Sequence, residues 1–127
     1  MAEAATIWVV DDEAAALRST ELVLLSEGYD AVRCFVSPLD ALDALATHQP
    51  ELIIADLCMP GMTGFDIAKA VRQIDEKVPF LICSGFLVDE DYQTIDRYEN
   101  MEALLKPLEI QNLAVKIRDM LEAAKVE

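Results

Sequence analysis

The chain has 127 residues, of which 54% are hydrophobic, so it is long enough to bury the core of one ordinary domain. Its 24 acidic residues outnumber 10 lysines and arginines, which gives a formal net charge of −14 and a pI near 4.2. Such a charge repels nucleic-acid phosphates and anionic lipids, so we expect no direct binding of nucleic acid or of a membrane.

The sequence also lacks the patterns of a membrane span, a secretory signal, a disulfide framework and a zinc site. No stretch approaches the roughly 20 apolar residues needed to cross a bilayer, and the N-terminus lacks the basic and apolar regions of a secretory signal. The cysteines, Cys34, Cys58 and Cys83, have no CxxC spacing, which disfavours a disulfide framework or a zinc site. We therefore expect a soluble, cytoplasmic protein whose residues 1–127 form one domain, with no effector domain in this chain.

Apolar runs of strand length alternate with segments of helical period along the chain. The predicted strands lie near residues 6–10, 31–35, 51–55, 79–83 and 102–105, and the predicted helices near 13–26, 38–47, 65–74, 88–98 and 109–124. The first, third and fourth strands are almost continuously apolar, which is typical of strands buried on both faces. Five βα units of this kind predict an α/β fold around a parallel sheet.

Two helix boundaries carry local signals. Gly28 suits the exit from the first helix, and Ser37 offers a capping hydroxyl just before Pro38, which is favoured in the first turn of the second helix. Asp66 is expected to lie in the first turn of the third helix, where a carboxylate interacts favourably with the helix dipole.

Acidic residues follow two of the predicted central strands. Asp11 and Asp12 come after the first strand, and Asp56 comes after the third. Carboxyl ends of parallel strands share one sheet edge, where open α/β sheets bind ligands. Three carboxylates in one small volume repel each other, so such a site holds a proton or binds a cation. Oxygen ligands favour Mg²⁺ over zinc or copper.

Three more features fall at the same predicted edge. A turn-rich loop from Cys58 to Gly64 offers backbone carbonyls beside Asp56, Ser84 offers a hydroxyl after the fourth strand, and Lys106 offers an ammonium after the fifth. Together they are the parts of a phosphoryl-transfer site, which works by positioning and charge neutralisation. Asp56 would be the nucleophile, Lys106 would pair with the phosphoryl group, and Asp12 and Asp56, with Asp11 more loosely, would hold Mg²⁺.

In these motifs the sequence resembles the receiver domains of bacterial two-component response regulators. The resemblance covers essentially the whole chain and rests on four segments in the family's order: Val9-Val10-Asp11-Asp12-Glu13, Asp56-Leu57-Cys58-Met59-Pro60-Gly61-Met62-Thr63-Gly64, Ser84-Gly85 and Lys106-Pro107. It implies a flavodoxin-like fold, a (βα)5 doubly wound sandwich with sheet order 2-1-3-4-5. It also implies phosphorylation of Asp56 by a partner sensor histidine kinase or histidine phosphotransfer domain, without turnover of an external substrate.

The resemblance also implies details of metal binding and switching. The backbone carbonyl of Cys58 would complete the Mg²⁺ shell with Asp11, Asp12 and Asp56. On phosphorylation the Ser84 hydroxyl would move toward the phosphoryl group, and the surface of the fourth helix, fifth strand and fifth helix would rearrange. Many members dimerise through that surface, so we expect a monomer or a weak, phosphorylation-dependent dimer.

The sequence departs from the family's pattern at two places. Ala103 stands where receivers usually carry an aromatic switch residue, and Glu99-Asn100 replace a common Gly-Ala before the fifth strand. We hypothesise that signalling relies on Ser84 and loop movement, or that the domain relays phosphate. Cys58 and Phe86 occupy positions associated with the phosphoryl lifetime, and because neither orients an attacking water, a long lifetime is expected.

Two other functions compete with this interpretation. A haloacid-dehalogenase-like phosphatase also forms an aspartyl phosphate. Its motif requires two aspartates separated by one residue, and if Asp11 is the nucleophile, Glu13 stands where the second aspartate should be. It also needs more chain for a cap domain. The third possibility is a pure interaction domain, with a receiver-like fold that no longer accepts phosphate. The absence of an aromatic residue at Ala103 favours this possibility, and the presence of all the pocket residues argues against it.

Overall fold

The structure is a computed structural model that describes the backbone of residues 3–125 and the side chains of residues 5–125. Five strands alternate with five helices: β1 (Glu3–Val10), α1 (Ala14–Ser26), β2 (Tyr29–Phe35), α2 (Pro38–Ala44), β3 (Leu52–Asp56), α3 (Gly64–Ile74), β4 (Phe80–Ser84), α4 (Asp89–Asp96), β5 (Met101–Leu105) and α5 (Ile110–Lys125). Residues 1, 2, 126 and 127 of the expected domain lie outside the described range.

All strand pairs are parallel, and the sheet order is β2-β1-β3-β4-β5. The predicted flavodoxin-like α/β fold is therefore confirmed. The strands predicted to be central, β1, β3 and β4, occupy the middle of the sheet, and all five residues of β4 are buried. Continuous apolar runs fit these strands because helices cover both faces of the sheet.

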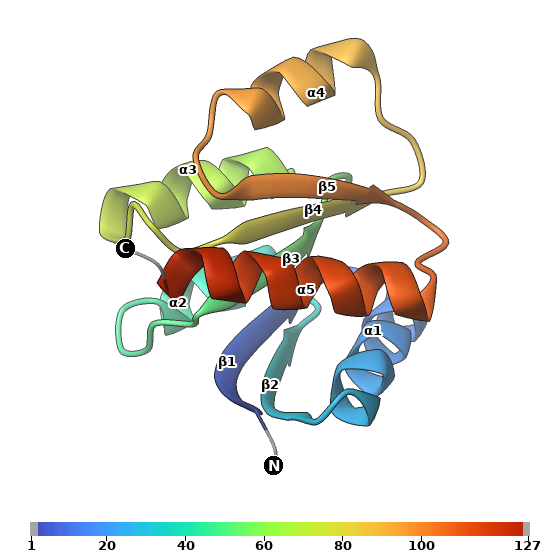
Figure 1. Cartoon of the computed structure of the whole chain (residues 1–127). Coiled ribbons are helices and arrows are strands. Elements are labelled where there is room, and N and C mark those ends of the chain that lie inside the picture. Colours follow the sequence, from blue (N-terminus) through green and yellow to red (C-terminus); the bar gives the residue numbers. More distant parts are fainter. Residues whose placement is uncertain (1–2, 126–127) are drawn as a thin grey trace.

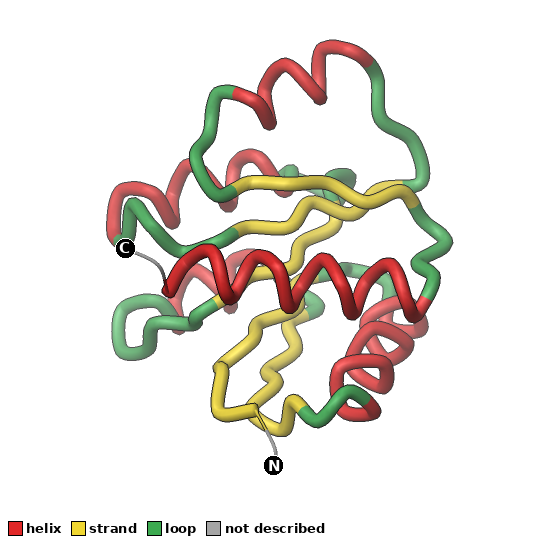
Figure 2. Tube along the Cα trace, viewed as in Figure 1, coloured by secondary structure: helices red, strands yellow, loops and turns green. Residues whose placement is uncertain are grey.

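The sheet separates two hydrophobic clusters, and Figures 1 and 2 show helices on both of its faces. On one face, Leu17 and Leu24 of α1 meet Leu113 and Ile117 of α5 against side chains of β1, β3 and β4. On the other face, residues of α2, α3 and α4 pack over Trp8, Ile53 and Phe80 of the sheet. No helix within residues 3–125 has the length and apolarity needed to cross a bilayer.

Some helix ends differ from the sequence prediction. Ser37 is the N-cap of α2, as its place before Pro38 suggested, but its side chain makes no capping hydrogen bond, so the predicted capping hydroxyl is wrong. α2 also ends at Ala44, three residues before the predicted end at 47. The first turn of α3 instead has a complete capping box, in which Thr63 and Asp66 exchange side-chain and backbone hydrogen bonds.

The start of α3 lies directly against the end of β3. A β-carbon placed on Gly64 would come within 2.8 Å of the backbone oxygen of Asp56 and 2.9 Å of Cδ1 of Ile82. The Gly64 amide also donates a 2.9 Å hydrogen bond to the carbonyl of Leu57. The missing side chain at Gly64 thus allows the helix to pack against the residue that the sequence predicts to be the nucleophile.

We predict that Gly64→Ala destabilises the protein, because the added methyl group forces the backbone at Asp56 or the Ile82 side chain to move. Overpacking of this kind costs about 1–3 kcal/mol in the free energy of unfolding, which urea denaturation measures. The matched control is Gly85→Ala, since a β-carbon there meets nothing within 4 Å. It is expected to change stability by less than about 0.5 kcal/mol, and equal losses in both variants would contradict the packing explanation.

Candidate functional site

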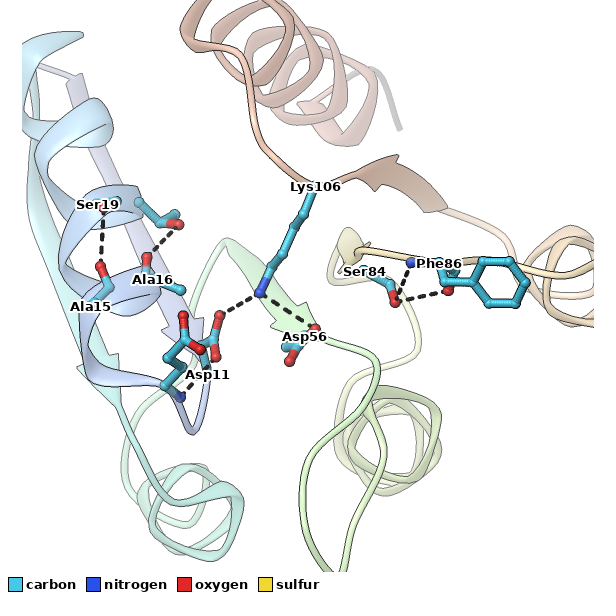
Figure 3. Close-up of polar contacts among 10 residues, drawn as sticks. Asp11, Ala15, Ala16, Ser19, Asp56, Ser84, Phe86 and Lys106 are labelled. Carbon is cyan, nitrogen blue, oxygen red and sulfur yellow. Dashed lines mark hydrogen bonds and ion pairs between the residues drawn. The ribbon is translucent and has the colours of Figure 1, made fainter.

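The topology gathers the predicted site residues at one edge of the sheet. Asp11 follows β1 directly, Asp56 is the last residue of β3, Ser84 is the last residue of β4, and Lys106 follows β5. The strand register brings these ends together, since Val10 pairs with Ala55, Asp56 with Cys83, and Ser84 with Leu105. Figure 3 shows the Lys106 side chain reaching between Asp11 and Asp56.

Three carboxylates form an acidic cluster at this edge. One oxygen from each of Asp11, Asp12 and Asp56 lies within 4.8 Å of the other two, which is close enough for all three to surround one ion. Mg²⁺ binds oxygens at about 2.0–2.1 Å, so opposite ligands stand roughly 4 Å apart. Asp12 is exposed and Asp56 is partly buried, so water also has access to the cluster. The donors therefore suit a hydrated magnesium ion in their chemistry, and their spacing of up to 4.8 Å is somewhat wider than that of ligands around a bound ion.

Lys106 supplies the positive charge of the cluster. Its Nζ donates a 2.8 Å hydrogen bond to Oδ2 of Asp11 and lies 3.5 Å from Oδ1 of Asp56. Burial alone would lower the pKa of Lys106, but the hydrogen bond from its ammonium to Asp11 and the attraction of both carboxylates together raise it. The lysine thus carries its charge at neutral pH and offsets part of the repulsion among the acids.

Asp56 lies in a different electrostatic environment from a surface carboxylate. Its side chain is 14% exposed. Burial raises the pKa of Asp56, the Lys106 charge opposes this, and the neighbouring Asp11 and Asp12 carboxylates raise it further. A cation bound among these oxygens would favour the ionised form, which is the form that acts as a nucleophile.

The Ser84 hydroxyl lies at the site but is already engaged. The side chain is buried, and its Oγ donates a 2.9 Å hydrogen bond to the carbonyl of Phe86 and accepts one of 3.3 Å from the Phe86 amide. The Phe86 ring points away from Asp56 and Lys106 in Figure 3 and is 73% exposed. Sequence reasoning missed this local bonding, because nothing in the residue types singles out the Phe86 backbone as a partner.

The three cysteines have separate environments. Burial raises the pKa of the Cys83 thiol to about 12 and that of the Cys34 thiol to about 11, so both are neutral thiols at physiological pH. Both pack with the cluster beneath α1 and α5, as predicted for small apolar strand residues. Cys58 is exposed in the loop after β3, two residues beyond Asp56. The use of its backbone carbonyl as a metal ligand stays a prediction.

The residues that depart from the expected pattern are well accommodated. Asn100 adopts a φ of 62°, a left-handed conformation that asparagine tolerates better than most residues, and its side-chain amide donates to the carbonyl of Lys77. Ala103 is partly buried against the cluster beneath α2, α3 and α4. A surface hollow of about 470 Å³ lies beside it and is also lined by Tyr92 of α4.

Comparison with curated proteins gives several relatives of similar sequence. The DNA-binding response regulator MtrA of Mycolicibacterium paratuberculosis is 29% identical over 117 residues, a match that covers 88% of this chain and 49% of the relative. The response regulator ArlR of Staphylococcus aureus is 31% identical over 115 residues, which covers 91% of this chain and 52% of the relative. The chain thus spans about half the length of the curated relatives it matches.

Solved structures match over nearly the whole chain. A CheY-like receiver domain from Methanospirillum hungatei superposes with a TM-score of 0.87 at 22% identity, covering 97% of this chain and 98% of that one. The chemotaxis protein CheY4 of Vibrio cholerae gives a TM-score of 0.84 at 26% identity, covering 91% and 98%. Residues 7–118 match the family described as response regulator receiver domain. The chain therefore belongs to the receiver-domain family of two-component response regulators, and it is a phospho-accepting signalling module.

Proposed function

We propose that Asp56 accepts a phosphoryl group from the phosphohistidine of a partner sensor histidine kinase or histidine phosphotransfer domain. The observation that carries this proposal is the approach of Lys106 to both Asp11 and Asp56, at an edge where three carboxylates have oxygens within 4.8 Å of one another. A partly buried, hydrogen-bonded ammonium beside a nucleophilic carboxylate suits a reaction in which negative charge must be neutralised.

The proposed transfer exchanges one bond for another. An oxygen of the Asp56 carboxylate attacks phosphorus, the P–N bond of the phosphohistidine breaks, and its electron pair returns to the imidazole of the partner. The product is an acyl phosphate on Asp56. Water later attacks phosphorus, which restores the carboxylate and releases inorganic phosphate. In this proposal Lys106 pairs with the phosphoryl oxygens, and the Ser84 hydroxyl donates to them after it leaves the carbonyl of Phe86.

Mg²⁺ is the proposed cofactor, held by Asp11, Asp12 and Asp56 together with the backbone carbonyl of Cys58. When bound, it would neutralise charge on the phosphoryl oxygens and orient them for in-line attack. The chain's own contribution is the spacing of the carboxylates and the ammonium. Because Lys106 holds one oxygen of Asp11, that carboxylate is restrained before any ion arrives.

The wider role is also part of the proposal. We assign residues 1–127 to one receiver domain that works in the cytoplasm and catalyses its own phosphorylation and dephosphorylation without an external substrate. It would act as a monomer or a weak, phosphorylation-dependent dimer. Its net charge of −14 disfavours direct contact with nucleic acid or a membrane, so any output passes through another protein or an attached domain.

We predict that acetyl phosphate with Mg²⁺ adds one phosphoryl group, about 80 Da, to the intact protein. Asp56→Asn should abolish this addition because the amide is not a nucleophile, and chelation of the metal should suppress it in the parent protein. Intact-mass spectrometry measures both effects. The matched control is Asp43→Asn, an exposed acid on α2, which should still gain the full mass. Addition of the same mass to Asp56→Asn would overturn the proposed function.

We also predict a pH-dependent gain of stability in Asp56→Asn without metal. Folding raises the pKa of Asp56 above its ordinary value of 3.8, because the ionised carboxylate is disfavoured in the folded protein. The free energy of unfolding is therefore highest below pH 3.8, where Asp56 is protonated, and it falls as the pH rises through the raised pKa. The amide cannot ionise, so the variant should be more stable than the parent at about pH 7, with the difference shrinking toward about pH 4.

Urea denaturation in the presence of a chelator measures that difference. Asp43→Asn serves again as the control, since it removes the same charge from an exposed position. A gain in Asp56→Asn that is constant across this pH range would show that the effect does not come from Asp56 ionisation.

The lifetime of the phosphorylated state provides a further prediction. Neither Cys58 nor Phe86 carries a side chain that can orient a water for attack on phosphorus, so the double variant Cys58→Asn, Phe86→Glu should hydrolyse faster, by up to about 100-fold. Loss of the added mass with time after removal of acetyl phosphate gives the half-life. An unchanged or longer half-life in the double variant would refute the role of these two positions.

A further inference from the structure

The strand β2 forms an open edge of the sheet. Among residues 3–125 it pairs with β1 alone, and the sheet order places it outermost. The carbonyl of Phe35 accepts a hydrogen bond from the amide of Asp11, which follows β1. The backbone groups of successive residues in a strand point to alternate sides, so the amides and carbonyls of Val32 and Cys34 face away from β1. Such outward backbone groups are a template for a further strand.

The face of the sheet that carries α2 leaves space beside this edge. α2 ends at Ala44, and a hollow of about 430 Å³ lies further along the edge. Ala31 and Val32 of β2 line the hollow together with His48, which follows the helix. The short helix therefore leaves the middle of β2 accessible from this face.

The other face has an apolar margin on α1, which packs beside β2 (Figure 1). Burial and the neighbouring Glu21 carboxylate raise the pKa of the Cys34 thiol, so the side of α1 that carries Glu21 faces β2. Leu25 lies one helical turn further along the same side. Leu25 is 43% exposed and Leu22 is 48% exposed, so two large apolar side chains flank the edge without being covered.

The Arg33 side chain, in the middle of β2, lies back over its own sheet. Its guanidinium carbon is 5.7 Å from the centre of the Trp8 ring and 5.0 Å from that of the Phe35 ring. Trp8 is the residue of β1 that pairs with Arg33, so the charged group lies on the inner side of the strand. The guanidinium therefore leaves the outward backbone groups of β2 uncovered.

The sequence of β2 is self-complementary in one antiparallel register. If Val32 faces the Val32 of a second copy, all seven residues of Tyr29–Phe35 find a partner. The facing pairs then include Arg33 with Ala31 and Asp30 with Cys34. Centring the pair on Arg33 or on Asp30 would instead place like charges opposite each other, which destabilises an antiparallel pair. The charges on the edge thus permit the full-length register and oppose these two shifted ones.

We propose that two copies of this chain associate through β2, which pairs with β2 of the second copy in antiparallel orientation around a two-fold axis at Val32. The two sheets become one sheet of ten strands, and Leu22 and Leu25 are covered where the two α1 helices meet. The contact lies at the opposite edge from β5 and does not rest on phosphorylation of Asp56. A net charge of −14 on each copy opposes it, so salt should strengthen the association.

Analytical ultracentrifugation of the full chain without a phosphodonor tests the association. The fraction of dimer should rise with protein concentration, and it should rise again when NaCl is increased from about 0.05 to about 0.5 M. A parent protein that stays monomeric in both salt concentrations, or a dimer that forms only after acetyl phosphate is added, would overturn the proposal.

Opposite substitutions at Ala31 test the register. Ala31→Glu would face Arg33 of the other copy and should tighten the dimer, and Ala31→Lys should weaken it. Each change should be roughly two- to thirtyfold in the association constant, the range for two symmetric cross-strand charge pairs. The controls are Ala123→Glu and Ala123→Lys at an exposed position on α5, where net charge alone predicts the reverse order. If the Ala31 variants follow the order of the Ala123 variants, the register is wrong.

Oxidative cross-linking gives a readout that does not depend on affinity. In a background of Cys34→Ser and Cys58→Ser, Val32→Cys would place two thiols on strands whose Cα atoms are about 5.5 Å apart, within the range of a disulfide. The control is Val36→Cys, which is 53% exposed but lies beyond the end of β2. Oxygen with copper phenanthroline should cross-link Val32→Cys roughly tenfold faster, because the strand pair holds its thiols together. Equal rates, or a faster reaction of the more exposed Val36→Cys, would refute the pairing.

Discussion

The contact between the Lys106 ammonium and the carboxylates of Asp11 and Asp56 is the interaction on which the site depends. Without it, three acids from two strands would lie together in a partly buried place with nothing to offset their repulsion. The lysine directly follows β5, which lies two places along the sheet from β3, so the charge balance also links separate βα units. The fold and the charge balance therefore depend on each other. The fold brings the three carboxylates together, and the Lys106 ammonium offsets the repulsion between them.

Much of this arrangement could be predicted from the sequence because parallel topology is a strong constraint. Once Ile7–Val10, Leu52–Ala55 and Phe80–Cys83 are interpreted as central strands, the polar residues that follow them must meet at one edge. The same reasoning placed Lys106 there, although the fifth strand is weakly apolar. Burial and sheet order involve residues along the whole domain. Many apolar positions therefore carry the same signal, and the prediction does not depend on any single residue.

Other features could not be predicted because they depend on local choices of similar energy. Ser37 has the right residue type and place for a capping hydroxyl, yet Thr63 makes the capping box, and such caps differ by only about 1 kcal/mol. The bonding of the Ser84 hydroxyl to the Phe86 backbone depends on the path of a loop that carries no pattern. Asn100 belongs to the pair that replaces the common Gly-Ala, and its left-handed backbone in the turn before β5 is a local conformation that no pattern in the sequence predicts.

The separation of the core into two clusters by the sheet has a consequence for how such a domain can diversify. Among the side chains of residues 5–125, the layer built by α1 and α5 shares no buried side chain with the layer that contains α4. Substitutions in one layer therefore alter packing energies that are nearly independent of the other, as expected for sites without common neighbours. Core substitutions beneath one set of helices can therefore accumulate with little effect on packing beneath the other set.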